Sequence, residues 1–556
     1  MRYFLLLLLG FLTLSAGQDM ELKKLIGRMI VVGFPSQTID KNSQIVKEMQ
    51  EYDLGGVILF DKFYKDRNLT KNISSPIQLK KLTSQLKKFS TKPLLISIDQ
   101  EGGRVARLKP SYGFLKVPSA KEISQMSVED AKRIYDAQSQ MLHINGINTN
   151  FAPVVDLAIN PKNKVIYGLN RSFGATSDEV VKYAKILIDS QTKQNVISVL
   201  KHFPGHGSSL GDSHKGFVDI TKTWSPKEIS PYYRLIKAGK VDMLMTAHVF
   251  NAKLDKNYPA TLSRFVNTKL LREQLGFNGV VISDDMQMKA ISKHYSLKDS
   301  VTLAINSGVD IVLFGNQLGS QSVKELVEII YAQVQNGTIK KERILEANQR
   351  IQNLHFKNLI IQRPIDFAEN RIDMTKAYIK QHYGFEVKNI EIEPKIIVLH
   401  WTAVMDFEKC FLRLKGEMLY SDRADIASAG ALNVSAHFLV ARDGTITQLM
   451  PDNWMARHVI GLNYSTIGIE NIGGENNAKE DLTQAQVESN VGLVKYLKAK
   501  YPSIEYLIGH HEYRAMEKTP LWLELDDGYR TKKADPGDKF MKSVRGQVEY
   551  LELKKP

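Results

Sequence analysis

The sequence predicts an α/β protein with an N-terminal (β/α)8 TIM barrel over residues 18–354, followed by a second, mixed α/β domain. Eight short aliphatic or β-branched runs alternate with longer amphipathic stretches between residues 30 and 314, which is typical of parallel strands buried on both faces. Eight such units with loop insertions indicate a barrel, and a doubly wound open sheet is the alternative. A chain of 556 residues also exceeds what one hydrophobic core supports.

Several of the predicted strands end in polar residues. Asp99, Asp156 and Asp284 stand at or near the ends of three of them, at the face where barrel enzymes place their catalytic groups. A helical stretch over 322–353 is expected to complete the barrel. The eight predicted strands are 30–34, 56–60, 94–99, 150–156, 199–203, 243–248, 280–285 and 311–314.

Residues 355–392 are expected to form a linker zone, and residues 393–556 a second domain. A strand over 395–400 begins this domain, and a hairpin is predicted over 435–449. Apolar side chains at helical spacing predict a helix over 484–500. Strands combined with a long amphipathic helix indicate a mixed α/β domain.

Residues 1–17 have the pattern of a secretory signal peptide. Arg2 supplies a positive charge, residues 3–14 are apolar, and residues 15–17 are small. An apolar run of about 12 residues is short for a bilayer span, so we expect cleavage, with a retained membrane anchor as the alternative. The expected protein is exported to the periplasm and has no stable membrane span after cleavage.

Charge and cysteine content narrow the class of partner. The chain has 75 Lys and Arg against 60 Asp and Glu, a formal net charge of +15, which favours polyanions such as nucleic acid, anionic lipid or an acidic cell-wall polymer. No basic and aromatic motif typical of nucleic-acid binding accompanies this charge, so nucleic acid is not an expected partner. The single cysteine, Cys410, cannot form an internal disulfide.

A dense histidine motif follows the start of the fifth predicted strand. K-H-F-P-G-H-G at 201–207 and D-S-H at 212–214 place three histidines and an aspartate within 14 residues. Histidines at this density in a loop favour a catalytic role, and a structural or metal-binding role is the alternative. Three further motifs are D-Q-E-G-G-R at 99–104 with Arg107, N-R-S-F-G at 170–174, and V-I-S-D-D-M at 281–286.

Together, and in this order, these motifs resemble the β-N-acetylglucosaminidases of glycoside hydrolase family 3. The resemblance implies a retaining mechanism without a cofactor, in which Asp284 is the nucleophile and His214, oriented by Asp212, is the acid/base. An imidazole suits this role because it titrates near neutral pH. His206 and Asp156 are expected to be structural. The resemblance also implies a set of residues that grip a terminal GlcNAc: Asp99, Arg107, Arg171, Lys201 and His202.

The second domain contains a candidate metal-binding set. His400 ends its first predicted strand, His510 follows a predicted strand at 505–508, and Asp535 lies further along the chain. Two histidines and one carboxylate are a minimal ligand set for catalytic zinc, with water as the fourth ligand. Spacing alone leaves scattered surface histidines as an equal alternative.

The segments around this set resemble type 2 N-acetylmuramoyl-L-alanine amidases, which share their fold with peptidoglycan recognition proteins. The matching segments are S-A-H-F-L-V at 435–440, A-R-H at 456–458 and S-T-I-G-I-E at 465–470. The resemblance implies a zinc amidase domain with one Zn²⁺ ion, held by His400, His510 and Asp535.

The resemblance implies further roles near this ion. Glu470 is the general base or orients the attacking water, and Lys533 stabilises the oxyanion that forms on the amide. His511, next to His510, is the alternative metal ligand.

For two further histidines of this domain, the sequence leaves two roles open. His437 and His458 either contact substrate or are structural. The chain departs from the amidase pattern by an insertion around 519–527 and by Arg457, which replaces a tryptophan. Both departures are expected to affect substrate fit.

The two predicted bonds flank a single sugar, N-acetylmuramic acid. One is the β-1,4 link from GlcNAc to MurNAc or anhydroMurNAc, and the other is the amide from MurNAc to L-alanine. The expected protein is therefore a bifunctional hydrolase that takes peptidoglycan or muropeptide fragments, in cell-wall turnover or recycling. The alternative is a peptidoglycan-binding scaffold in which one or both sites are inactive.

Overall fold

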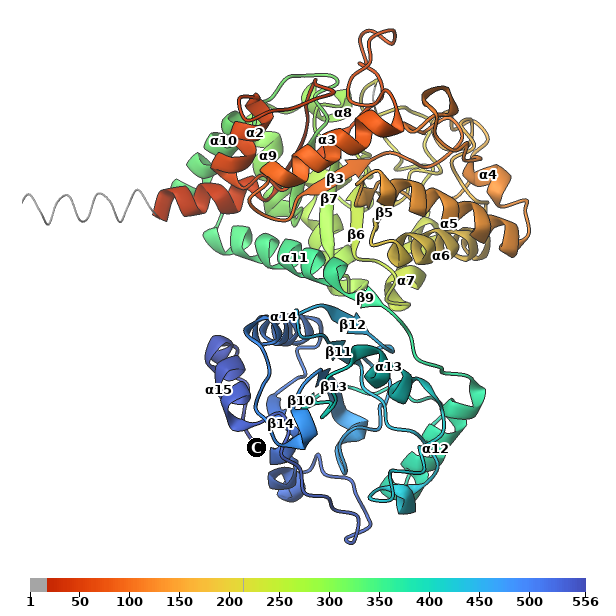
Figure 1. The fold of residues 1–556 in the computed structure, drawn as a ribbon. Helices are drawn as coiled ribbons and strands as arrows, with labels where there is room; N and C mark the ends of the chain where they lie inside the picture. Colours follow the sequence, from red (N-terminus) through yellow and green to blue (C-terminus); the bar gives the residue numbers. More distant parts are fainter. Residues whose placement is uncertain (1–17, 214) are drawn as a thin grey trace, which may run out of the picture. The chain divides into compact units, whose positions relative to one another are not determined.

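The computed structural model describes residues 18–213 and 215–556 (Figure 1). The predicted signal peptide, 1–17, and His214 lie outside the described residues. The chain forms two compact units, Met1–His355 and Phe356–Pro556, and each has hydrophobic clusters of its own. Among the described residues, no helix is both long enough and apolar enough to cross a membrane.

Eight parallel strands close into a barrel in the first unit, in chain order. β1 pairs with both β2 and β8, which excludes the alternative of an open sheet. Both faces of the strands are buried, as continuous apolar runs require. The strands are β1 Ile30–Gly33, β2 Gly56–Leu59, β3 Leu95–Ile98, β4 Thr149–Asn150, β5 Ile197–Phe203, β6 Met243–Thr246, β7 Val280–Asp285 and β8 Ile311–Phe314.

β4 is much shorter than the predicted strand over 150–156. Pro153 has no N–H to donate, so the regular ladder ends before it. The chain then follows β5 through irregular bonds, in which Val155 N donates to Lys201 O at 2.9 Å and Lys201 N donates to Pro153 O at 3.2 Å. This irregular segment carries Asp156 to the carboxyl end of the barrel.

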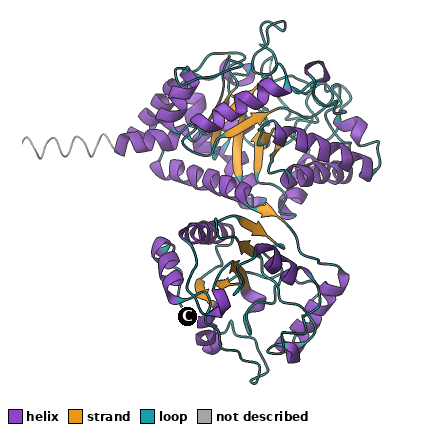
Figure 2. Cartoon of the chain, in the orientation of Figure 1, coloured by secondary structure: helices purple, strands orange, loops and turns teal. Residues whose placement is uncertain are grey.

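Helices enclose the barrel strands (Figure 2). Most begin at a Ser or Thr that accepts a backbone N–H; at α6, for example, Thr176 and Glu179 form a capping box. The main helical elements are α2 Gln44–Tyr52, α3 Pro76–Phe89, α4 Ala120–Ile123, α5 Val128–Ile144, α6 Ser177–Lys193, α7 Ser230–Lys237, the π-helix Phe265–Gln274, α8 Lys289–Ser292, α9 Leu297–Ser307, α10 Val323–Gln335 and α11 Lys341–Leu359.

The helical stretch expected over 322–353 consists of two helices, α10 and α11. Gly337 follows the end of α10 with φ of 78°, a left-handed conformation that favours glycine. The break lets α11 start in a new direction.

A six-stranded sheet forms the centre of the second unit, in the order β14-β10-β13-β11-β12-β9. β10 runs parallel to β13 and β14, and β11 and β12 form the predicted hairpin. The helix predicted over 484–500 is confirmed as α14 Gln484–Lys500. The other elements are β9 Ile361–Gln362, β10 Ile396–Trp401, β11 Phe438–Val440, β12 Ile446–Gln448, β13 Thr466–Asn471, β14 Tyr506–Gly509, α12 Glu369–Tyr383, α13 Phe407–Lys415 and α15 Asp538–Gln547.

The two faces of β10 pack against different helices. Ile397 and Leu399 lie in a cluster with α14 and α15, whereas Ile396 and Val398 lie in a cluster with side chains of α12. Since alternate residues of a strand share a face, His400 lies on the face of Ile396 and Val398. This face carries the candidate site described below.

The segment expected to be a linker zone, 355–392, is instead part of the second unit. α12 lies within it, and its side chains belong to one of that unit's hydrophobic clusters. The insertion at 519–527 covers this helix, because His382 Nδ1 lies 2.9 Å from Glu524 Oε1 and both side chains are buried. The linker prediction failed because these contacts join residues far apart in the chain.

Candidate active sites

The first candidate site is a cavity of about 460 Å³ at the carboxyl ends of the barrel strands. The structure brings together every predicted residue of this site that it describes, whereas His214 lies outside the described residues. The predicted residues that line the cavity are Asp99, Arg107, Arg171, Lys201, His202, Asp212 and Asp284.

An ion network of buried and half-buried side chains joins four of the predicted sugar-binding residues. Lys201 donates to Asp99 at 2.8 Å, and its ammonium lies 2.7 Å from Glu101. Arg171 donates to both oxygens of Glu101 at 2.7 Å, and Arg107 donates to Asp99 at 3.1 Å. Although burial raises it, the charges of Lys201 and Arg107 hold the pKa of Asp99 well below its ordinary value. The charged groups are thus fixed before any sugar binds.

Glu101 is a site residue that the sequence analysis does not single out. Burial raises the pKa of this carboxyl, but Arg171 and Lys201 lower it further, so that the net shift is downward. Its place in the motif at 99–104 was the available signal. What the sequence does not show is that Glu101 joins two cations from distant parts of the chain, Lys201 in β5 and Arg171 in a loop.

His202 is held by the buried Asp156. Its Nδ1 lies 2.8 Å from Oδ2 of Asp156, and the same carboxylate accepts the backbone N–H of His206 at 2.8 Å. The Nε2 of His202 lies 3.4 Å from Nη2 of Arg171. His206 contacts Ser209 Oγ at 2.7 Å, and burial lowers its pKa to about 4. Asp156 and His206 therefore hold the motif loop in place, in agreement with a structural role.

Asp284 lies near the end of β7, and Asp285 beside it also lines the cavity. One oxygen of Asp285 accepts the backbone N–H of Gln287 at 3.0 Å, and the backbone N–H of Asp285 donates to Asp284 Oδ1 at 2.8 Å. Asp212, from the loop after β5, lines the same cavity. The structure thus places the candidate nucleophile and the aspartate of the candidate acid/base pair on one cavity.

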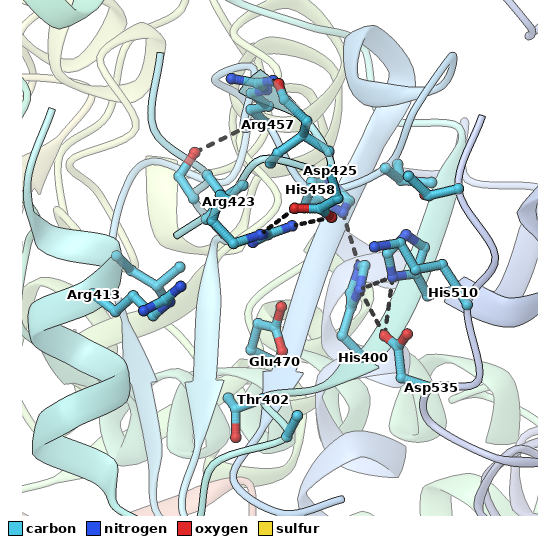
Figure 3. Close-up of a pocket in the computed structure, with 18 of the residues that line it drawn as sticks. His400, Thr402, Arg413, Arg423, Asp425, Arg457, His458, Glu470, His510 and Asp535 are labelled. Atoms are coloured by element: carbon cyan, nitrogen blue, oxygen red, sulfur yellow. Dashed lines mark hydrogen bonds and ion pairs between the residues drawn. The ribbon is translucent and has the colours of Figure 1, made fainter. Parts of the chain in front are cut away.

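The second candidate site is a cavity of about 1010 Å³ in the second unit. Figure 3 shows His400, His510 and Asp535 converging on one another, with Glu470 nearby on the neighbouring strand. All five predicted residues of this site line the cavity: His400, Glu470, His510, Lys533 and Asp535.

Three buried ligand atoms form a compact triangle. The Nδ1 atoms of His400 and His510 are 3.0 Å apart, and Oδ2 of Asp535 lies 3.2 Å from the first and 3.0 Å from the second. In a tetrahedral zinc site with bonds of about 2.0–2.2 Å, ligand atoms are roughly 3.3 Å apart. Burial lowers the pKa of His510 to about 4, so its ring is neutral, which is the form that binds a metal. This donor set could therefore hold one metal ion.

A second histidine supports His400. The Nε2 of His400 lies 2.9 Å from Nδ1 of His458, whose Nε2 lies 2.9 Å from Thr466 Oγ1. If Nδ1 of His400 binds a metal, Nε2 carries the proton and donates to His458, which in turn donates to Thr466. This chain of donors fixes the tautomer and the orientation of His400. His458 is thus a supporting residue.

The other two histidines of this region lie outside the ligand triangle. Both ring nitrogens of His437 contact backbone groups: the N–H of Gly468 donates to Nδ1 at 2.9 Å, and Nε2 lies 2.8 Å from the backbone oxygen of Trp454. These contacts indicate a structural role. The ring nitrogens of His511 lie 3.0 Å from the backbone oxygen of Asp535 and 3.0 Å from Oδ1 of Asp538. The geometry therefore favours His510 over His511 as the ligand.

Glu470 is a half-buried carboxylate on the wall of the cavity. Burial raises its pKa to about 7. Its Oε2 has no hydrogen-bond partner among the described residues. Lys533 lines the same cavity, and its positive charge lowers the pKa of Glu470, which offsets part of the rise caused by burial. A carboxylate in this state can exchange a proton near neutral pH.

Arg457, which replaces the family's tryptophan, is a buried cross-link. Its guanidinium donates to the backbone oxygens of Ile426 at 2.8 Å and Gly430 at 3.2 Å, and also to that of Leu432. It lies over the ring of Tyr378 at 5.2 Å. Arg457 therefore shapes the wall of the second cavity by holding the loop at 426–432.

Comparison with known sequences finds a family model for each unit. Residues 21–354 match the model of the glycosyl hydrolase family 3 N terminal domain, and residues 391–538 match that of N-acetylmuramoyl-L-alanine amidase. The chain is 34% identical over 269 residues to a beta-hexosaminidase of Tolumonas auensis, covering 47% of this chain and 76% of that relative. It is 32% identical over 337 residues to beta-hexosaminidase A of Pseudoalteromonas piscicida, covering 56% and 54%.

Solved structures show the same fold. The β-N-acetylhexosaminidase of Beutenbergia cavernae is 26% identical, with a TM-score of 0.54 over 60% of this chain and 98% of that chain. A family 3 β-N-acetylglucosaminidase of Paenibacillus sp. is 23% identical, with a TM-score of 0.55 over 96% and 89%, which supports the fold alone. Since the first family model spans more than half of the sequence, the chain is a hydrolase that belongs to glycosyl hydrolase family 3 and carries an N-acetylmuramoyl-L-alanine amidase domain.

Proposed function

We propose that the chain is a bifunctional hydrolase of peptidoglycan fragments. The first unit would remove a terminal β-1,4-linked GlcNAc from MurNAc or anhydroMurNAc, and the second would hydrolyse the amide between MurNAc and L-alanine. The observation that supports this most strongly is the presence of two assembled sites in one chain, one in a family 3 glycosyl hydrolase domain and one in an N-acetylmuramoyl-L-alanine amidase domain. The two proposed bonds flank one N-acetylmuramic acid.

In the first site, Asp284 would attack the anomeric carbon of GlcNAc, and a carboxylate–sugar bond would form as the glycosidic bond breaks. The leaving oxygen would take a proton from His214, which Asp212 orients. Water would then attack the anomeric carbon and give a proton to the same histidine, as the bond between the sugar and Asp284 breaks. The ion network of Lys201 and Arg171 would hold the sugar hydroxyls and the N-acetyl group with little reorganisation, because its charges are already fixed.

In the second site, His400, His510 and Asp535 would hold one Zn²⁺ ion. Bound there, zinc would supply a Lewis acid for the amide carbonyl and activate water. Glu470 would accept the proton of the attacking water and pass it to the leaving amine. Lys533 would oppose the negative charge that develops on the carbonyl oxygen.

The predicted signal peptide supports a location in the periplasm, where wall fragments are released. There the enzyme would act in wall turnover or in the scavenging of muropeptides. The rival function is a peptidoglycan-binding scaffold with an inactive site. The complete ligand triangle and the assembled ion network favour catalysis, because binding alone requires neither.

The test is mass spectrometry of the products from purified GlcNAc-anhydroMurNAc-peptide, with and without a chelator. We expect loss of GlcNAc under both conditions and free peptide only when metal is available. Binding of the fragment without any product would favour the scaffold. Release of peptide that a chelator does not reduce would contradict the zinc assignment.

A further inference from the structure

The cations that line the first cavity fall into two groups. The inner group consists of cations paired with carboxylates, as in the contacts of Lys201 and Arg107 with the half-buried Asp99. The outer group stands nearer to solvent and is cationic. We name it the cationic rim, and its members are Lys62, Arg67, Lys164 and Lys215. Three of the four, all except Lys62, are exposed, although each lines the cavity.

One side of the cationic rim is an ordered loop after β2. Lys62 donates to Asn68 O and Thr70 Oγ1, both at 3.3 Å, and so closes the loop on itself. Gln317, from the loop after β8, ties it to the barrel, because its side chain accepts from Tyr64 N at 2.8 Å and donates to Lys62 O at 3.0 Å. These contacts hold the base of the loop whose tip carries Arg67.

The opposite side is anchored by a buried asparagine. Asn163 donates to His206 O at 2.8 Å and Gly207 O at 3.1 Å, while its own side-chain oxygen accepts from the backbone N–H of Val165 at 2.9 Å. Lys164 lies between these two anchored positions. Its backbone is therefore fixed to the same motif loop that leads to the predicted acid/base pair.

The positive charges of Arg67 and Lys164 are not neutralised by any carboxylate of the described residues. Arg67 contacts the ring of Tyr64 at 5.3 Å, and neither Arg67 nor Lys164 forms an ion pair with a described residue. A cavity lined by charge of one sign at its entrance attracts ligands of the opposite sign. The rim is thus suited to a group that carries a negative charge.

The position of the rim indicates which part of a substrate it meets. Asp284, the candidate nucleophile, is half-buried and lines the cavity together with the ion network, so the sugar on the non-reducing side of the scissile bond must bind against these groups. The leaving group then extends toward the solvent-exposed part of the lining. We propose that the cationic rim is an aglycone subsite that selects a leaving group bearing a free carboxylate.

This inference rests on the proposed glycosidase activity and specifies its substrate. The carboxylate has two sources in a muropeptide: the lactyl group of MurNAc after the peptide has been removed, or the peptide while it is still attached. The first source would place the amidase step before the glycosidase step. A carboxylate on an attached peptide would instead leave the order free.

The experiment measures kcat/KM for GlcNAc release by the full chain from four probes. These are GlcNAc-MurNAc with a free lactyl carboxylate, its methyl ester, GlcNAc-MurNAc-L-alanine, and the neutral disaccharide of GlcNAc. The amidase is blocked by Glu470→Gln, so that the L-alanine probe stays intact. The test variant is Arg67→Gln with Lys164→Gln. The control is Lys65→Gln with Lys162→Gln, which removes the same charge from exposed positions of the same loops that do not line the cavity.

We expect the ratio of kcat/KM for the free acid to that for its methyl ester to fall roughly three- to tenfold in the test variant, because exposed charge pairs are individually weak. The control should keep the wild-type ratio. The wild-type ratio should also fall as salt rises from about 0.01 M to 0.15 M, since the Debye length shortens from about 30 to 8 Å. A preference for the L-alanine probe over the lactyl acid would assign the rim to the peptide carboxylate.

Two failures are distinguishable. Release of GlcNAc from all probes, with the same ratio of acid to ester in wild type and test variant, would overturn the subsite and leave the proposed glycosidase intact. No release from any probe would overturn the proposed glycosidase and the subsite with it.

Discussion

His400 and Glu470 are register partners across the parallel strands β10 and β13, so both side chains lie on the same face of the sheet. The sheet, instead of a loop, therefore sets the position of the candidate base relative to the candidate ligand. Strands hold side chains more precisely than loops do, which suits a base that must meet a bound water.

Glu470→Gln tests the role of this carboxylate. The amide keeps the shape of the side chain but cannot accept a proton, so we expect amide hydrolysis to fall roughly 10²- to 10⁴-fold, the usual contribution of general base catalysis. Metal content and GlcNAc release should be unchanged. A variant that keeps more than a third of the wild-type amidase rate would exclude Glu470 as the base.

The ligand triangle predicts one zinc ion per chain, measured by elemental analysis of the purified protein. His510→Ala should lose the ion and the amidase activity, because two ligands rarely hold a catalytic zinc. His511→Ala is the matched control, because the ring of His511 contacts Asp538 and the backbone oxygen of Asp535 and lies outside the ligand triangle. Loss of zinc from the His511 variant alone would show that the assignment of the two histidines is reversed.

Two substitutions should separate the activities. Asp284→Asn should abolish GlcNAc release and leave the amidase unchanged, whereas His400→Ala should do the reverse, because the two residues lie in different compact units with separate cavities. Both rates are read from one digest of the same muropeptide. If either substitution removed both activities, the chain would not contain two independent sites.

The sequence predicted the parts of the fold that depend on local pattern. β7 and β8 lie where their apolar runs begin and end, and α14 matches its predicted bounds, because burial imposes a period that short segments already show. The ligand and sugar-binding sets were predicted from the resemblance of sequence motifs to two enzyme families.

The remaining differences depend on contacts between distant residues. α12 was expected to be part of a linker because its own sequence does not reveal that the insertion at 519–527 covers it. Glu101 was not singled out because its role depends on Arg171 and Lys201, which come from distant parts of the chain. Such contacts carry no local pattern, so a single sequence does not predict them.

Glu101→Gln tests whether the ion network positions the sugar-binding groups. The substitution leaves Arg171 and Lys201 with one anion fewer, and uncompensated buried charge is costly. We expect kcat/KM for GlcNAc release to fall roughly 10- to 100-fold, with most of the loss in KM, since substrate contacts made by both cations would be displaced. Amidase activity reports on the integrity of the second unit. An unchanged KM would show that the network is only structural.

The burial of Glu228 is expected to make the stability of the first unit depend on pH. This fully buried residue accepts the backbone N–H of Gly207 at 2.9 Å and of Ser208 at 3.2 Å, while its Oε1 has no partner among the described residues. Burial raises its pKa from 4.5 to about 7. Between these values the folded chain binds more protons at this group than the unfolded chain does, so the free energy of unfolding falls as pH rises from about 4.5 to 7 and then levels off.

Glu228→Gln should remove this dependence, because the amide oxygen can still accept the two N–H groups and no charge has to be buried. Relative to wild type, we expect the variant to gain stability at pH 8, by at most about 3 kcal/mol at about 1.4 kcal/mol per pKa unit, and to gain little at pH 5. Calorimetric Tm values at the two pH values measure this. Glu129→Gln, at an exposed position of α5, is the control and should show no difference between them. A loss of stability at pH 8 would mean that the ionised carboxylate is the form the loop requires.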